Sequence, residues 1–131
     1  MENSSAGVKR ILVVEDESGI RQVCQRVLTS QGYQVDFAPN GAIAEDMLSK
    51  EDYDLLLVDI KTPVRNGKEF YQNIKDTKDK YSKLLSRVIF TTGDVIGDDT
   101  QSFLKQAGRP FLLKPFTPDE LQSIVKENLN R

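Results

Sequence analysis

The strongest constraint on the fold is a series of short apolar segments that recur along the chain with longer amphipathic segments between them. Leu55–Val58 consists of four consecutive aliphatic residues without polar alternation, and Ile11–Val14 has the same character. Such runs are typical of strands that are covered on both faces, as in parallel sheets. Further apolar runs lie at residues 35–38, 88–90 and 111–113. The sequence therefore predicts five strands.

Helical patterns separate these strands. We expect Ser18 to cap a helix that ends before Gly32, and Asn40 to cap a second helix. The residues expected on the buried side of the second helix are Ile43, Met47 and Leu48. Further helices are predicted over 68–77 and 99–107. The run Thr117-Pro118-Asp119-Glu120 predicts a capping box at the start of the last helix.

Strand–helix alternation over 131 residues favours one α/β domain. Right-handed crossovers then give a doubly wound, five-stranded parallel sheet with helices on both faces, a three-layer sandwich. We predict the flavodoxin-like strand order 2-1-3-4-5. The domain is expected to span residues 9–131, preceded by a disordered lead-in over 1–8.

The composition excludes several kinds of chemistry. The chain has no histidine and a single cysteine, Cys24, so no intrachain disulfide, Ser-His-Asp triad or His-ligated zinc site can form. Cys24 lies on an apolar helical stripe, and we interpret it as a core residue. The net charge of −2 gives no overall basic field for nucleic acid. The lack of a possible disulfide framework favours a location in the reducing cytosol. The first residues lack the apolar run of a signal peptide, and no stretch approaches the length of a membrane span.

Polar residues follow the predicted strands. Glu15 and Asp16 follow the first strand, Asp59 the third and Lys114 the fifth. In the predicted order these ends meet at one edge of the sheet, where ligands bind in such folds. Each like-charge pair at about 4 Å costs roughly 4 kcal/mol at an effective dielectric near 20, so a cation is needed. Carboxylate oxygens favour Mg²⁺, with Mn²⁺ as an alternative.

Four segments resemble the receiver domains of two-component response regulators, the CheY-like family. They are residues 11–17, residues 55–59 with the following Pro63 and Gly67, residues 88–93 and residues 111–116. The segments at Thr92-Gly93-Asp94 and 110–116 also resemble receivers attached to hybrid sensor histidine kinases. Thr62 departs from the family, which usually has a bulky apolar residue before Pro63.

The resemblance implies a role for each site residue. Asp59 would take the phosphoryl group from a phosphohistidine, and Lys114 and the hydroxyl of Thr92 would contact that group. The implied Mg²⁺ ligands are Asp16, Asp59, the backbone carbonyl of Lys61 and, through water, Glu15. The Lys114–Pro115 peptide bond would be cis.

The resemblance also implies a conformational switch. Thr91 and Thr92 are both candidates for the switch hydroxyl, and we prefer Thr92 because the family usually has a small residue, here Gly93, after it. Phe111 would move inward together with Thr92. We further expect Lys61 and Asp94 to tune the lifetime of the aspartyl phosphate, because they lie two residues beyond Asp59 and Thr92.

The expected partners are a histidine kinase or histidine phosphotransfer domain, a downstream output domain or protein, and a second copy of the chain. We expect the domain alone to contact neither nucleic acid nor membrane. It would be no enzyme beyond its own phosphorylation and autodephosphorylation, although a longer parent chain could be a hybrid kinase. One alternative is a pseudo-receiver that binds partners without taking phosphate. Another is an aspartate-nucleophile phosphatase, which Lys61 disfavours because such enzymes carry a second Asp there.

Overall fold

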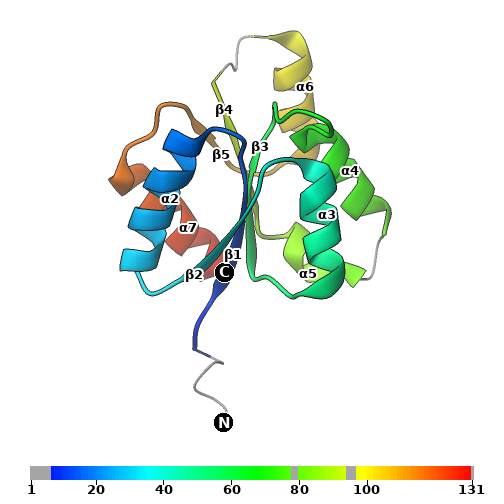
Figure 1. Cartoon of the computed structure of the whole chain (residues 1–131). Helices are drawn as coiled ribbons and strands as arrows, with labels where there is room; N and C mark the ends of the chain where they lie inside the picture. The colour runs from blue at the N-terminus through cyan, green and yellow to red at the C-terminus, as the bar shows by residue number, and fades with distance from the viewer. Residues whose placement is uncertain (1–6, 78–79, 94–96, 131) are drawn as a thin grey trace.

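The five strands form a single parallel sheet in the order β2-β1-β3-β4-β5 (Figure 1). The computed structural model describes residues 7–77, 80–93 and 97–130, without the side chain of residue 98. This strand order confirms the predicted doubly wound architecture. The strands are β1 (Arg10–Val14), β2 (Gln34–Ala38), β3 (Leu55–Asp59), β4 (Val88–Thr92) and β5 (Phe111–Leu113).

Helices cover both faces of the sheet. In Figure 1, α2 and α7 lie on one face and the remaining helices on the other. The helices are α2 (Ser18–Ser30), α3 (Gly41–Lys50), α4 (Gly67–Asp76), α5 (Ser82–Leu85), α6 (Asp98–Ala107) and α7 (Pro118–Leu129). None of these helices combines the length and apolar character that a membrane span requires.

Successive strand residues contribute to the two halves of the core in turn. In β3, Leu55 and Leu57 pack on the α2/α7 side, whereas Leu56 and Val58 pack on the α3/α4 side. All five residues of β3 are buried, as the unbroken apolar run predicted. Burial of side chains of this size stabilises the fold by about 1.5–3 kcal/mol each.

Most of the predicted helix ends are confirmed. The Asn40 side chain accepts a hydrogen bond from the Ile43 N–H at 3.0 Å. Thr117 and Glu120 form the predicted capping box, with reciprocal bonds of 3.1 and 2.8 Å. Gly32 follows α2 with a φ of 89°, a backbone conformation that favours glycine.

Three local predictions need correction. The N-cap of α2 is Glu17 rather than Ser18, and no side chain caps this helix. The Glu17 carboxylate instead reaches toward Lys114, as described below. Ile43 is 44% exposed, because α3 turns Ala44 and Leu48 toward the core. The connection between β3 and β4 contains a second helix, α5, in addition to the predicted one.

The predicted domain boundary at residue 9 falls just before β1. Residues 1–6 of the expected lead-in lie outside the described residues, and the remaining two, Gly7 and Val8, are exposed.

Candidate functional site

The candidate site lies at the carboxyl edge of the sheet, where four strand ends each contribute a polar residue. Glu15 follows β1, Asp59 ends β3, Thr92 ends β4 and Lys114 follows β5. The Lys114 backbone N–H donates to the Thr92 carbonyl at 2.8 Å. This bond places Lys114 beside the end of β4, at the same edge of the sheet as the other polar residues. The predicted strand order therefore brings together residues that lie far apart in the sequence.

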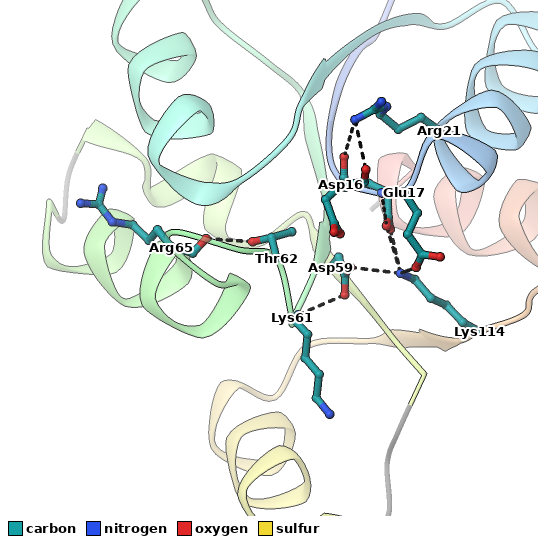
Figure 2. Close-up of polar contacts among 9 residues, drawn as sticks. Asp16, Glu17, Arg21, Asp59, Lys61, Thr62, Arg65 and Lys114 are labelled. Carbon is teal, nitrogen blue, oxygen red and sulfur yellow. Dashed lines mark hydrogen bonds and ion pairs between the residues drawn. The ribbon is translucent and has the colours of Figure 1, made fainter.

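The Lys114 ammonium group is the centre of this arrangement (Figure 2). Its Nζ atom lies 2.9 Å from Glu15 Oε1 and 3.1 Å from Asp59 Oδ2. All three side chains are largely buried, with Glu15 only 1% exposed. Ion pairs in such a setting are short and charge-assisted, and either carboxylate would be costly to bury without the lysine.

A third carboxylate, that of Glu17, completes the cluster. Its Oε1 atom lies 3.4 Å from Lys114 Nζ, and one oxygen each of Glu17, Glu15 and Asp59 lie within 4.8 Å of one another. Glu17 was not among the site residues predicted from the sequence. Its position directly after Glu15 and Asp16 could have indicated a place in the site, but the family resemblance implies roles only for Glu15 and Asp16.

Asp16 is exposed and does not belong to this three-carboxylate cluster. In Figure 2 its side chain extends from the β1–α2 loop in the direction of Asp59. Arg21, which was also not among the predicted site residues, holds this loop. Its guanidinium donates to the backbone carbonyl of Glu15 at 3.2 Å and to that of Asp16 at 3.5 Å. Contacts to backbone carbonyls carry no residue-type signal, which explains why no pattern indicated Arg21.

The protonation of the cluster follows from burial. Burial raises the pKa of Glu15 to about 7, and the Asp59 carboxylate adds to this rise, although the hydrogen bond from Lys114 opposes it. Burial disfavours the charge of Lys114, but its hydrogen bonds to Glu15 and Asp59 outweigh this and raise its pKa above the usual range. Lys114 is therefore a fixed positive charge.

Asp59 has a different partner on each carboxylate oxygen. Oδ2 contacts Lys114, and Oδ1 accepts a hydrogen bond from the Lys61 backbone N–H at 3.1 Å. Gly67 packs against the Asp59 backbone so closely that a Cβ atom there would lie 2.5 Å from the Asp59 carbonyl oxygen. The close packing explains why the family resemblance includes a glycine at position 67, since any larger residue would clash with the Asp59 backbone.

The candidate switch residues occupy different environments. Thr91 and Thr92 are both buried, and Thr91 lies opposite Asp59 in the strand register. The Thr91 hydroxyl has no hydrogen-bond partner among the described residues, and Thr91 lines a small void together with Val13 and Cys24. Phe111 is 43% exposed on the edge strand. Asp94 lies outside the described residues.

The cluster is chemically suited to a hard cation. When all three carboxylates are ionised, the single ammonium group leaves two negative charges unbalanced. The donors are oxygens alone, the ligand type that Mg²⁺ and Mn²⁺ prefer over softer metals. The remaining expectation, a cis Lys114–Pro115 peptide bond, is confirmed.

Together, the doubly wound sheet and its acidic edge with a buried lysine define a receiver-type signalling domain. The family model of the response regulator receiver domain matches residues 11–126. The chain therefore belongs to this family, the phosphoacceptor domains of two-component signal transduction.

Individual relatives agree with this membership. Response regulator Rre1 of Synechocystis is 37% identical over 123 residues, which cover 92% of this chain and 52% of that protein. Sporulation initiation phosphotransferase F of Bacillus subtilis is 34% identical, with 92% and 94% of the two chains covered. The chain thus spans about half the length of the first relative and nearly all of the second.

A solved structure is similar throughout. The receiver domain of the sensor histidine kinase PA1611 from Pseudomonas aeruginosa, with a magnesium ion coordinated in its active-site cleft, gives a TM-score of 0.83 at 28% identity. The match covers 95% of this chain and all of that one.

The raised pKa of Glu15 predicts a specific pH dependence of stability. The folded state keeps the Glu15 proton up to about pH 7, whereas the unfolded chain loses it near pH 4.5. Because the folded state binds more protons in this window, the contribution of Glu15 to the free energy of unfolding falls as pH rises through it. Without divalent ions, the stability of the wild type relative to Glu15→Gln should therefore fall by on the order of 2–3 kcal/mol between about pH 4.5 and 7.5. Urea unfolding of both proteins measures this difference, and a pH-independent difference would contradict the assignment.

Proposed function

We propose that Asp59 accepts a phosphoryl group from a phosphohistidine in a reaction that requires Mg²⁺. The observation that carries the proposal is the geometry at Asp59: one carboxylate oxygen contacts Lys114 at 3.1 Å and the other accepts the Lys61 N–H at 3.1 Å. The carboxylate is therefore oriented before any donor arrives. Orientation of a nucleophile is a principal contribution to phosphoryl transfer.

In the reaction, an Asp59 oxygen attacks the phosphorus atom and forms an O–P bond while the N–P bond of the donor breaks. The imidazole of the donor keeps the electron pair of the broken bond and takes up a proton. Lys114 offsets negative charge on the transferred group, and we assign the Thr92 hydroxyl to one of its oxygens. Bound Mg²⁺ would offset charge on the same oxygens. The proposed ligands of this ion are Asp59, Asp16, the Lys61 carbonyl and, through water, Glu15. Glu17 lies close enough to Glu15 and Asp59 that we propose it as a further ligand.

We further propose that phosphorylation biases a Thr92–Phe111 switch. Phe111 has room to gain burial because it is 43% exposed on the edge strand next to β4. An aspartyl phosphate adds charge and acceptor oxygens that would draw the Thr92 hydroxyl toward Asp59. A shift of Thr92 would then open space for the aromatic ring.

The proposed donor is a histidine kinase or a histidine phosphotransfer domain in the cytoplasm. An output domain or protein reads the phosphorylated state, and a second copy of the domain is a further candidate partner. The isolated domain acts on no separate substrate in this proposal, whereas a longer parent chain could carry kinase activity. Asp59, Glu15 and Lys114 are all retained and in contact, which argues against a pseudo-receiver.

Phosphorylation of Asp59 can be tested directly with a small donor. Incubation with acetyl phosphate and Mg²⁺ should add one phosphoryl group to the intact protein, as measured by mass spectrometry. Asp59→Asn should abolish this addition because it removes the nucleophilic oxygen. Asp52→Asn, an exposed aspartate at the opposite end of β3, is the matched control and should be modified normally. Modification of Asp59→Asn at the wild-type rate, or turnover of an ordinary phosphate ester, would contradict the proposal.

We also propose that Lys61 and Asp94 slow hydrolysis of the aspartyl phosphate. In Figure 2 the exposed Lys61 side chain extends away from the Asp59 carboxylate. In this proposal it swings across the mouth of the site after phosphorylation and obstructs attacking water. Lys61→Ala and Asp94→Ala should each shorten the phosphoprotein lifetime by about 2- to 10-fold. Lys50→Ala, an exposed lysine on α3, serves as the control. The lifetimes are measured by loss of the phosphoryl mass after removal of the donor, and unchanged lifetimes would remove this role.

A further inference from the structure

The loop between β3 and α4 (residues 60–66) contains a strained turn directly beyond Asp59. The Arg65 N–H donates to the Pro63 carbonyl at 2.7 Å, and Val64 between them has a φ of 65°. A β-branched residue rarely adopts this conformation, which costs on the order of 1–3 kcal/mol. Val64 is 84% exposed, so its own side chain contributes little packing to offset the strain. Other contacts must hold the turn.

The contacts that hold the turn converge on one atom, the carbonyl oxygen of Arg65. The Thr62 hydroxyl donates to it at 2.8 Å, a contact visible in Figure 2, and the Gly41 N–H donates to it at 2.9 Å. Thr62 is 5% exposed, so its hydroxyl bond is shielded from water. A Cβ atom at Gly41 would lie 2.8 Å from the same carbonyl, so the start of α3 must be glycine for the loop to come this close.

The turn is coupled to the nucleophile through the backbone. Lys61, which donates its N–H to Asp59 Oδ1, directly precedes Thr62. Farther along the loop, the Gly67 N–H donates to the Ile60 carbonyl at 2.9 Å. The loop is therefore closed at its base, while the Thr62 hydroxyl fixes its middle. A change at Thr62 would reach the Asp59 carboxylate by way of one peptide unit.

We propose that Thr62 is a positioning residue for phosphoryl transfer: its hydroxyl holds the strained turn at Val64 and thereby keeps the Lys61 N–H on Asp59. This inference rests on the proposed function of Asp59. It gives a role to the residue that departs from the family pattern, because a bulky apolar side chain before Pro63 could not donate this hydrogen bond.

The first experiment compares Thr62→Val with Thr62→Ser. Valine keeps the shape of the side chain and loses the hydroxyl, whereas serine keeps the hydroxyl. With acetyl phosphate and Mg²⁺, Thr62→Val should lower the initial phosphorylation rate by about 5- to 20-fold, and Thr62→Ser should stay within about 2-fold of the wild type. Thermal unfolding is measured for each protein, and the rates are compared well below every midpoint.

A second measurement needs neither metal nor phosphate. Hydrogen exchange of the Lys61 amide, followed by NMR, should accelerate in Thr62→Val and remain near the wild-type rate in Thr62→Ser. This measurement separates the proposed phosphorylation of Asp59 from the proposed positioning role of Thr62. Failure of the wild type to take phosphate would overturn the proposed function, while the exchange data would still decide whether Thr62 holds the Lys61 N–H.

The link to strain is tested with Val64→Gly, because glycine adopts positive φ without cost. In this background the turn no longer needs the hydroxyl, so Thr62→Val should lower the phosphorylation rate by less than about 2-fold. Val64→Gly alone should phosphorylate within about 2-fold of the wild type. An equal loss in both backgrounds, or wild-type phosphorylation and Lys61 exchange in Thr62→Val, would overturn the proposal.

Discussion

The contact of one ammonium group with carboxylates from two strands is the interaction around which this domain is built. Lys114 lies 2.9 Å from Glu15 and 3.1 Å from Asp59, and Glu17 approaches from the start of α2. Without the lysine, the buried Glu15 and Asp59 carboxylates would lie side by side with no positive charge to offset them, which is strongly destabilising. The excess of negative charge that remains is the basis for the proposed divalent-cation site.

The fold could be predicted almost completely from the sequence. Apolar runs such as Leu55–Val58, bounded by clear helix signals, leave few arrangements other than a doubly wound sheet, and the structure has the predicted strand order. The details that failed were local. Ser18 has a good capping side chain, yet Ser18 is already the first residue of the helix, and the N-cap Glu17 directs its carboxylate to Lys114 rather than to the helix N–H groups. Ile43 fits a helical stripe, but the neighbouring Ala44 allows α3 to lie closer to the core.

The candidate site was predictable to the extent that it follows from strand ends. Glu15, Asp59 and Lys114 meet because parallel strands place their carboxyl ends at one edge. Glu17 and Arg21 were missed because their roles depend on the path of a loop, to which Arg21 contributes through backbone carbonyls. Thr62 appeared in the sequence only as a departure from the family. Its contact with the Arg65 carbonyl depends on the turn at Val64. No residue pattern in the sequence predicts the positive φ of Val64.

The proposed phosphoryl transfer requires that Asp59 and the acidic residues of the β1–α2 loop bind one divalent ion while Lys114 stays in contact with the Asp59 carboxylate. The most direct measurement is an anomalous difference map from crystals of the wild-type domain soaked in Mn²⁺. We expect a single strong peak within coordination distance of Asp59 and the acidic residues of the β1–α2 loop, with Lys114 still beside the Asp59 carboxylate. No peak at this edge of the sheet, or an ion bound away from Asp59, would contradict it.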